Sequence, residues 1–346
     1  MDDFTLNLHR RLPPEGNLVW SPYSVASALA MVAAGARGTT REELTRVLGA
    51  PPERLRLAEA AVLDDAEIAV ADILWAREGL AVEDSYQRAI ADLPGAAIRV
   101  ADFAADPEGA RRAINAEVEK VTRDLIRDLL QPGTVDRRTA AVIANALYLK
   151  AAWRHEFAER DTRPGPFHGA LGRREVPMMR RTGRMAYAEA DGWRMATLPA
   201  GDEVAVDVLL GPGPEAAPPG LDLLRRLRES ARYVSVALSL PRFRVESRAS
   251  LGDTLAALGA GTAFTGDADL SGMTAEPVRL DRIEHKAVLD VDESGFEGAA
   301  ATAVVVTLSA VTAGRPVEFR VDRPFLVFVR HPGSGAVYFA ARVTDP

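Results

Sequence analysis

The pattern of apolar and polar positions predicts helices and strands in mixed order along the chain. Apolar residues recur at helical spacing over residues 24–35, 82–93, 107–130, 221–232 and 251–258. Alternating or continuous apolar positions predict strands over residues 66–76, 97–103, 139–152, 194–198, 204–210, 234–240, 286–291 and 317–321. The long, nearly continuous apolar run at 139–152 is typical of a central strand, which is covered on both faces. The pattern as a whole predicts an α+β fold.

One helix start is predicted from a capping motif. Thr39 lies three residues before Glu42, which is the spacing of a capping box. In a capping box, the side chain of each of the two residues accepts a hydrogen bond from the backbone N–H of the other. We therefore expect a helix that begins at Thr39 and follows the apolar helix that Gly35 ends.

The segment 293–310 has the composition of a strand in a position that calls for a loop. Residues 299–313 contain no Gly, Pro, Asn, Asp or charged residue, so no turn is specified there. Small residues give way to a β-branched run at 304–307, which favours a strand. The segment nevertheless connects the predicted strands 286–291 and 317–321. A connection of about 25 residues without turn residues through its middle is uncommon in a compact domain and is usually functional.

Sequence motifs on both sides of this segment, and elsewhere in the chain, resemble those of the serpins, a family of protease inhibitors with an exposed, insertable reactive loop. Any one motif is a weak match, but five of them occur in the family's order. They are residues 17–25 with 35–40, residues 145–153, residues 240–247, residues 284–293 and residues 319–330. The resemblance implies a serpin fold with three β-sheets, about eight or nine helices and an exposed reactive-centre loop at about 293–317. It also implies a single domain over residues 1–346.

The resemblance further implies a suicide mechanism rather than an enzyme. A serine protease of the chymotrypsin or elastase type would attack the loop and form an acyl-enzyme. The cleaved loop would then insert into the largest sheet, as serpin loops do, and trap the protease. The alternative is a non-inhibitory serpin-fold protein that binds or chaperones other molecules and is cleaved as a plain substrate.

The resemblance assigns roles to particular residues. Family spacing places the scissile bond sixteen positions after Glu293, between Ser309 and Ala310, with the bond between Leu308 and Ser309 as the alternative. The hinge that inserts first comprises Glu293, Ser294, Gly295, Phe296, Glu297, Gly298, Ala299, Ala300, Ala301 and Thr302. A hydrogen-bonded cluster beneath the sheet, called the shutter, comprises Ser21, Ser24, Asn145 and His285, and the breach at the top of the sheet holds Trp153.

Two hinge residues depart from the family pattern. Phe296 stands where Thr or Ser is usual, and Gly298 stands where Ala is usual. A bulky Phe296 either slows insertion or occupies an apolar pocket, and the sequence leaves both outcomes open.

Composition and charge narrow the function further. The formal charge of −7 over 346 residues argues against general nucleic-acid binding, and no apolar run has the length of a membrane span. The acidic start shows no signal peptide, so we expect either a cytoplasmic protein or one secreted after processing. Cysteine is absent, and no Gly-x-Ser-x-Gly elbow occurs. We expect a monomer without a cofactor. We also expect no metal site, because the five histidines lack the spacing of metal ligands: His9, His155, His168, His285 and His331.

The scarcity of Asn, Gln and Lys has two readings. Few thermolabile amides suit a heat-stable protein, whereas the codon bias of a GC-rich bacterial genome produces the same composition. The segment 49–65 is short, and its stretch 51–57 is not strongly basic, so we expect no heparin-type activation.

Overall fold

The computed structural model describes residues 1–280, 282–296 and 315–346, and its elements follow the predicted mixed order. The first half contains α1 (Asp2–His9), β1 (Leu18–Trp20), α2 (Pro22–Gly35), α3 (Gly38–Leu48), β2 (Glu67–Arg77), α4 (Asp84–Ala91), β3 (Ala96–Ala101), α5 (Pro107–Val121) and β4 (Ala141–Ala152). The second half contains β5 (Arg163–Gly169), β6 (Gly172–Ala190), β7 (Trp193–Ala200), β8 (Val204–Leu210), α6 (Leu221–Ser230), β9 (Arg232–Pro241), β10 (Phe243–Ser250), α7 (Gly252–Leu255), β11 (Ile283–Val291), β12 (Gly295–Phe296), β13 (Val317–Arg320), β14 (Phe325–Arg330) and β15 (Val337–Val343).

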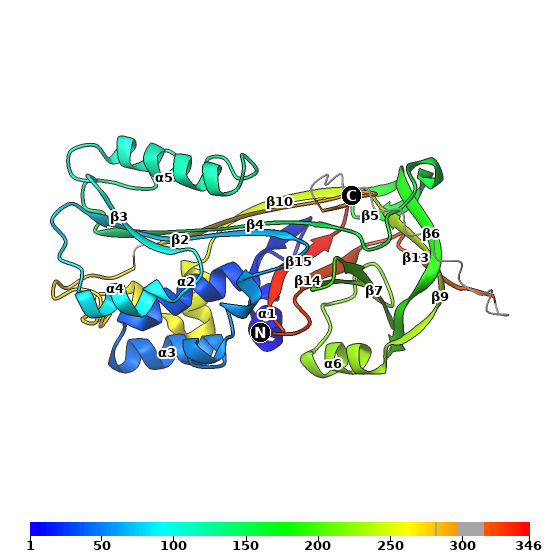
Figure 1. Cartoon of the computed structure of the whole chain (residues 1–346), viewed down its shortest axis with the longest axis horizontal. Coiled ribbons are helices and arrows are strands. Elements are labelled where there is room, and N and C mark those ends of the chain that lie inside the picture. The colour runs from blue at the N-terminus through cyan, green and yellow to red at the C-terminus, as the bar shows by residue number, and fades with distance from the viewer. Residues whose placement is uncertain (281, 297–314) are drawn as a thin grey trace.

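A six-stranded sheet in the order β10-β11-β12-β4-β2-β3 forms the middle layer of the molecule. Helix α5 covers one face, and α2, α3 and α4 lie on the other (Figure 1). The pleat of β2 divides its side chains accordingly, because Ile73 joins the core under α5 and Leu74 joins the core around α2. The prediction of a central strand at 139–152 is confirmed by β4, which lies inside this sheet and is buried along almost its whole length.

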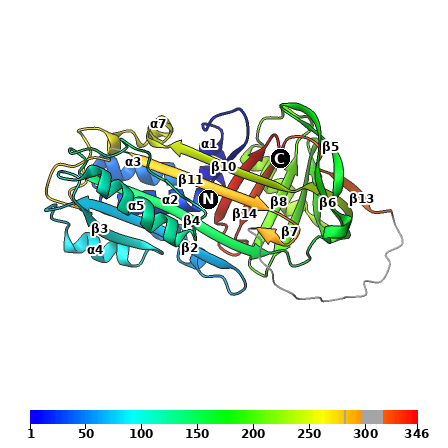
Figure 2. The same ribbon diagram turned by 90° about the horizontal axis from the view of Figure 1, so that it is seen from above.

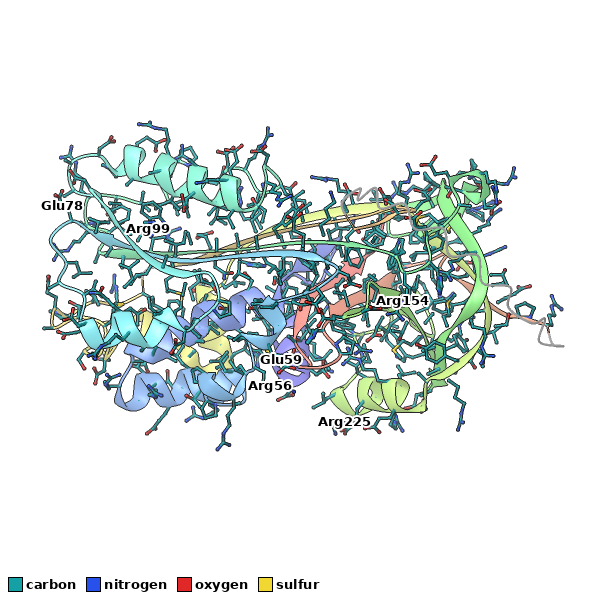
Figure 3. All side chains as sticks on the ribbon, in the orientation of Figure 1. Arg56, Glu59, Glu78, Arg99, Arg154 and Arg225 are labelled. Atoms are coloured by element: carbon teal, nitrogen blue, oxygen red, sulfur yellow. The ribbon has the colours of Figure 1, made fainter. Side chains whose placement is uncertain are left out.

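A nine-stranded sheet occupies the other end of the molecule (Figure 2). Its strands follow the order β1-β15-β14-β8-β7-β6-β9-β13, and β5 pairs with β6. The two sheets meet where β4 ends, because Trp153 forms an isolated bridge with Ala200 of β7. Figure 3 marks the next residue, Arg154, which forms an ion pair with Asp202 at this junction.

The described strands hydrogen-bond into two sheets, whereas three were expected. The cause is β6, which is 19 residues long and pairs with β5, β7 and β9 at different points along its length. A strand of that length joins what would otherwise be two sheets. The described part of the chain contains seven α-helices, close to the eight or nine expected.

Two local predictions were wrong. The helix predicted over 107–130 ends at Val121, because Arg123 and Asp124 adopt positive φ angles of 50° and 65° that no α-helix continues through. The capping box at Thr39 does not form. Helix α3 begins at Gly38, so Thr39 lies within its first turn, and no side chain caps this helix.

Candidate functional site

Strands β4 and β11 run parallel and leave a strand position between them that is only partly filled. They pair directly only at one end, where residues 283–285 face residues 143–145. At the other end β12 lies between them and is antiparallel to both, with Phe296 opposite Ala151 on β4 and Val291 on β11. The segment predicted to be a hinge therefore begins inside the sheet.

A turn at residues 292–295 directs the chain into this position. The Asp292 carboxylate accepts hydrogen bonds from the Ser294 backbone N–H at 2.8 Å, the Ser294 hydroxyl at 2.6 Å and the Gly295 N–H at 3.1 Å. The Trp153 indole N–H donates to the Asp292 carbonyl at 2.8 Å. The turn is thus fixed both by its own side chains and by the end of β4.

Glu293 attaches the same turn to the neighbouring strands. Its carboxylate accepts hydrogen bonds from Arg242 and from the Thr162 hydroxyl, each at 2.6 Å, and only 5% of the residue is exposed. Burial opposes ionisation of Glu293, but these two donors outweigh it and hold its pKa below the ordinary value. The charged form is therefore the one that stabilises the start of the hinge.

Phe296 occupies an apolar pocket, which is one of the two outcomes that the sequence left open. The side chain is 2% exposed and packs edge-on against Trp153, with ring centroids 5.1 Å apart. Trp153 in turn packs edge-on against Phe157 at 6.1 Å. In the described structure, Phe296 therefore anchors β12 between β4 and β11.

Gly295 is required where β12 passes β4, and Gly295→Ala is expected to displace β12. A Cβ at this position would lie 2.1 Å from the Ala151 carbonyl oxygen, and φ is +156°. Loss of Phe296 burial would then cost about 2 kcal/mol. We expect tryptophan emission to move to longer wavelength and the thermal midpoint to fall. Gly266→Ala is the matched control, because a Cβ there has open space. An unchanged spectrum and midpoint in Gly295→Ala would contradict this account.

The four residues predicted to form the shutter lie together between the six-stranded sheet and the first turn of α2. The Ser21 side chain caps this helix by accepting from the Ser24 N–H at 3.1 Å, and the Ser21 N–H donates to His285 Nε2 at 3.0 Å. The Ser24 hydroxyl donates to Asn145 Oδ1 at 2.5 Å, and Asn145 Nδ2 donates to the Ser24 carbonyl at 2.7 Å. All four residues are at most 2% exposed. The cluster holds β4 and β11 against one helix end.

His285 is the one titratable residue among these four, and it is uncharged. Because Nε2 accepts a hydrogen bond, the ring proton is on Nδ1, and burial lowers the pKa of His285 to about 4. The imidazole is therefore neutral at physiological pH.

A fifth member of the cluster, Asp72 of β2, was not predicted from the sequence. Asn145 Nδ2 donates to Asp72 Oδ1, and the Asp72 residue is completely buried. Burial raises the pKa of Asp72 to about 7, against the opposing effect of the Ser27 and Asn145 side chains. A signal was present, since Asp72 is a lone carboxylate within the apolar run 68–76. Strand pairing, which the sequence does not show, puts it beside Asn145.

The remaining predicted site residues lie outside the described residues. These are the hinge residues Glu297, Gly298, Ala299, Ala300, Ala301 and Thr302, and the scissile candidates Leu308, Ser309 and Ala310. Within the ranges that the structure describes, no group of three or more His, Cys, Asp or Glu side chains is arranged to hold a metal ion. Among the helices of the described part, none has the length and apolar character needed to cross a membrane.

Comparisons with known proteins agree on one family. The family model "Serpin (serine protease inhibitor)" matches residues 1–346. Serpin-Z2B of Oryza sativa subsp. japonica is 33% identical, over 99% of this chain and 96% of that protein. Leukocyte elastase inhibitor of Bos taurus is 31% identical, over 96% of this chain and 94% of that protein. The crystal structure of Serpin48, a highly specific serpin of the insect Tenebrio molitor, is 27% identical with a TM-score of 0.85, over 100% of this chain and 96% of that one.

Proposed function

The chain belongs to the serpin family, and we propose that residues 1–346 form one domain that inhibits a serine protease as a suicide substrate. The observation that carries the proposal is the partly filled strand position between β4 and β11. A segment with strand composition follows β12 directly, so one chain supplies both the position and the strand that fits it.

The register at the two ends of this position supports insertion without slippage. Residues of β11 and β4 that face each other differ by 140 in number where the strands pair directly, as for His285 and Asn145. The same difference separates Val291 and Ala151, which both face Phe296. Continuing β12 residue by residue would bring Thr302 opposite Asn145 and His285 at once. A cleaved loop can therefore pair with both neighbours in one register.

Insertion would be strongly favourable once the loop is cut. Residues 297–308 would gain roughly a dozen ladder hydrogen bonds at about 1 kcal/mol net each, in addition to apolar burial. The protease, attached through its acyl bond, would be carried along by the moving strand. Distortion of its oxyanion hole would then slow deacylation, since loss of one donor typically costs about 10²- to 10³-fold in rate. The inhibitor is consumed in this process and does not turn over.

We infer a protease of the chymotrypsin or elastase type. Cleavage between Ser309 and Ala310 suits an enzyme with a small specificity pocket, and cleavage between Leu308 and Ser309 suits one that accepts leucine. The 31% identity to leukocyte elastase inhibitor supports this class of target.

The test is to mix the protein with elastase and with chymotrypsin and to run denaturing gels. We expect a complex that survives denaturation, because an acyl bond joins the two proteins, together with a released carboxy-terminal fragment whose mass identifies the scissile bond. Heat-inactivated protease serves as the control. Clean cleavage with full recovery of protease activity would contradict inhibition and support the plain-substrate alternative.

A further inference from the structure

Three polar side chains form a row across the closed end of the strand position. Asp72, Asn145 and His285 lie opposite one another on β2, β4 and β11. They share the face that packs against α2, as the pleat of each strand requires. This row sits at the last direct pairing of β4 with β11, so any strand that enters further must part the sheet here.

Asp72 has little to support a negative charge in the closed sheet. Its Oδ1 accepts a hydrogen bond from Asn145, and Oδ2 has no hydrogen-bond partner among the described residues. The Asp72 backbone N–H is taken up by the Gly95 carbonyl, and the adjoining residue of β3 is Ala96. No ion pair joins the Asp72 carboxylate to a cationic side chain in the described part of the chain.

The titratable groups that face Asp72 do not supply a compensating charge. On α2 the neighbour is Tyr23, whose pKa is raised by burial and further by Asp72, so it stays neutral. Across Asn145 the neighbour is His285, whose buried imidazole is also neutral. The Asn145 amide, which donates to Asp72, and the nearby Ser27 hydroxyl of α2, which makes no hydrogen bond in the closed sheet, are the polar groups that favour the ionised form.

We propose that Asp72 controls the opening of β4 from β11, with the protonated carboxyl holding the sheet closed and the ionised carboxylate promoting its opening. This inference rests on the proposed function, in which that opening admits the loop. Parting the rungs at residues 143–145 and 283–285 would let water reach the Asn145–Asp72 pair. Hydration stabilises a carboxylate far more than the dry closed site does, so ionisation favours the open state.

The direction of the pH dependence follows from the two states. In the closed sheet the pKa of Asp72 is raised to about 7, whereas in a hydrated open state it would return toward the ordinary value of about 4. Asp72 therefore favours closure fully below about pH 4. This preference is lost progressively as the pH rises from about 4 to about 7. Above about pH 7 the equilibrium between the closed and open sheet no longer changes with pH. Between pH 5.5 and 8 the open population is expected to rise about 30-fold.

Hydrogen–deuterium exchange of the full-length protein tests this, with protection factors measured for peptides of β4 and β11 at pH 5.5 and 8. Wild type is expected to lose protection about 30-fold over this interval. Asp72→Asn keeps a side chain that accepts from Asn145 but cannot ionise, so its protection should change less than threefold. Peptides of β8 in the other sheet are the internal control.

His285→Gln separates the two titratable candidates, since it should retain the wild-type pH profile if Asp72 is responsible. A flat wild-type profile, or an equal slope in wild type and Asp72→Asn, would overturn the inference. If Asp72→Asn does not fold, the pH profiles of wild type and His285→Gln still test the role of Asp72. Both should then lose protection between pH 5.5 and 8. Exchange needs no protease, so a protein that shows this profile but traps no protease refutes only the proposed function, and the reverse result refutes only the role of Asp72.

Discussion

Thr302→Arg is expected to abolish the proposed trapping of a protease and to leave a substrate that the protease cleaves and releases. If β12 extends in its present register, residue 302 arrives between Asn145 and His285 and faces α2. Both of those residues are nearly fully buried. An arginine there would place an unpaired guanidinium in the core, which costs several kcal/mol. Insertion would stall before the protease is displaced. The acyl-enzyme would then be hydrolysed and the active protease released.

Glu297→Arg is the matched control for this prediction. The same register puts residue 297 opposite Lys150 and Asp290, both of which are partly exposed, so an arginine there would stay hydrated. We expect the gel-stable fraction to fall at least tenfold in Thr302→Arg and less than twofold in Glu297→Arg, with cleavage of both. Equal trapping by the two variants would mean that the loop does not insert in this register.

Much of the scaffold around the site could be predicted from the sequence, because burial leaves a direct pattern. The strand at 204–210 is confirmed at both ends by β8, and the apolar run at 139–152 by β4. Family motifs identified Ser21, Ser24, Asn145 and His285, and the structure brings these four residues together. In each case a local property, apolar periodicity or a short motif, carries the information.

Features that depend on long-range pairing could not be read in the same way. Asp72 joins the cluster because β2 pairs with β4, and a lone acidic residue in a strand does not reveal its partner. Similarly, the sequence alone does not show whether Phe296 obstructs the sheet or anchors the chain in it. The edge-on contact with Trp153, which only the fold brings about, identifies it as an anchor. The premature end of α5 rests on positive φ angles at Arg123 and Asp124, residues that are compatible with a helix by propensity. Tertiary context overrides local preference at each of these points.

Cleavage of the loop is expected to raise the thermal stability of the protein strongly. The intact protein holds a strand position that β12 only partly fills, and the proposed function implies that the native state is metastable with respect to the inserted one. A gain of about 12 kcal/mol from the new ladder bonds corresponds to a rise of about 15 °C for a chain of 346 residues, given about 2.1 cal/mol/K of unfolding entropy per residue.

Any protease that cuts within the loop serves for this experiment, whether or not it is trapped. Thr302→Arg again provides the control. Its cleaved loop should stop inserting before residue 302, so cleavage should raise the thermal stability of this variant only slightly. This comparison separates the effect of insertion from that of simply cutting a surface segment.

The thermal midpoint of the loop-cleaved protein, compared with that of the intact protein in the same buffer, tests most directly whether the segment after β12 becomes a strand between β4 and β11. We expect a midpoint about 15 °C higher after cleavage, and little change in Thr302→Arg. A cleaved wild-type protein that melts at or below the midpoint of the intact one would show that the segment does not insert.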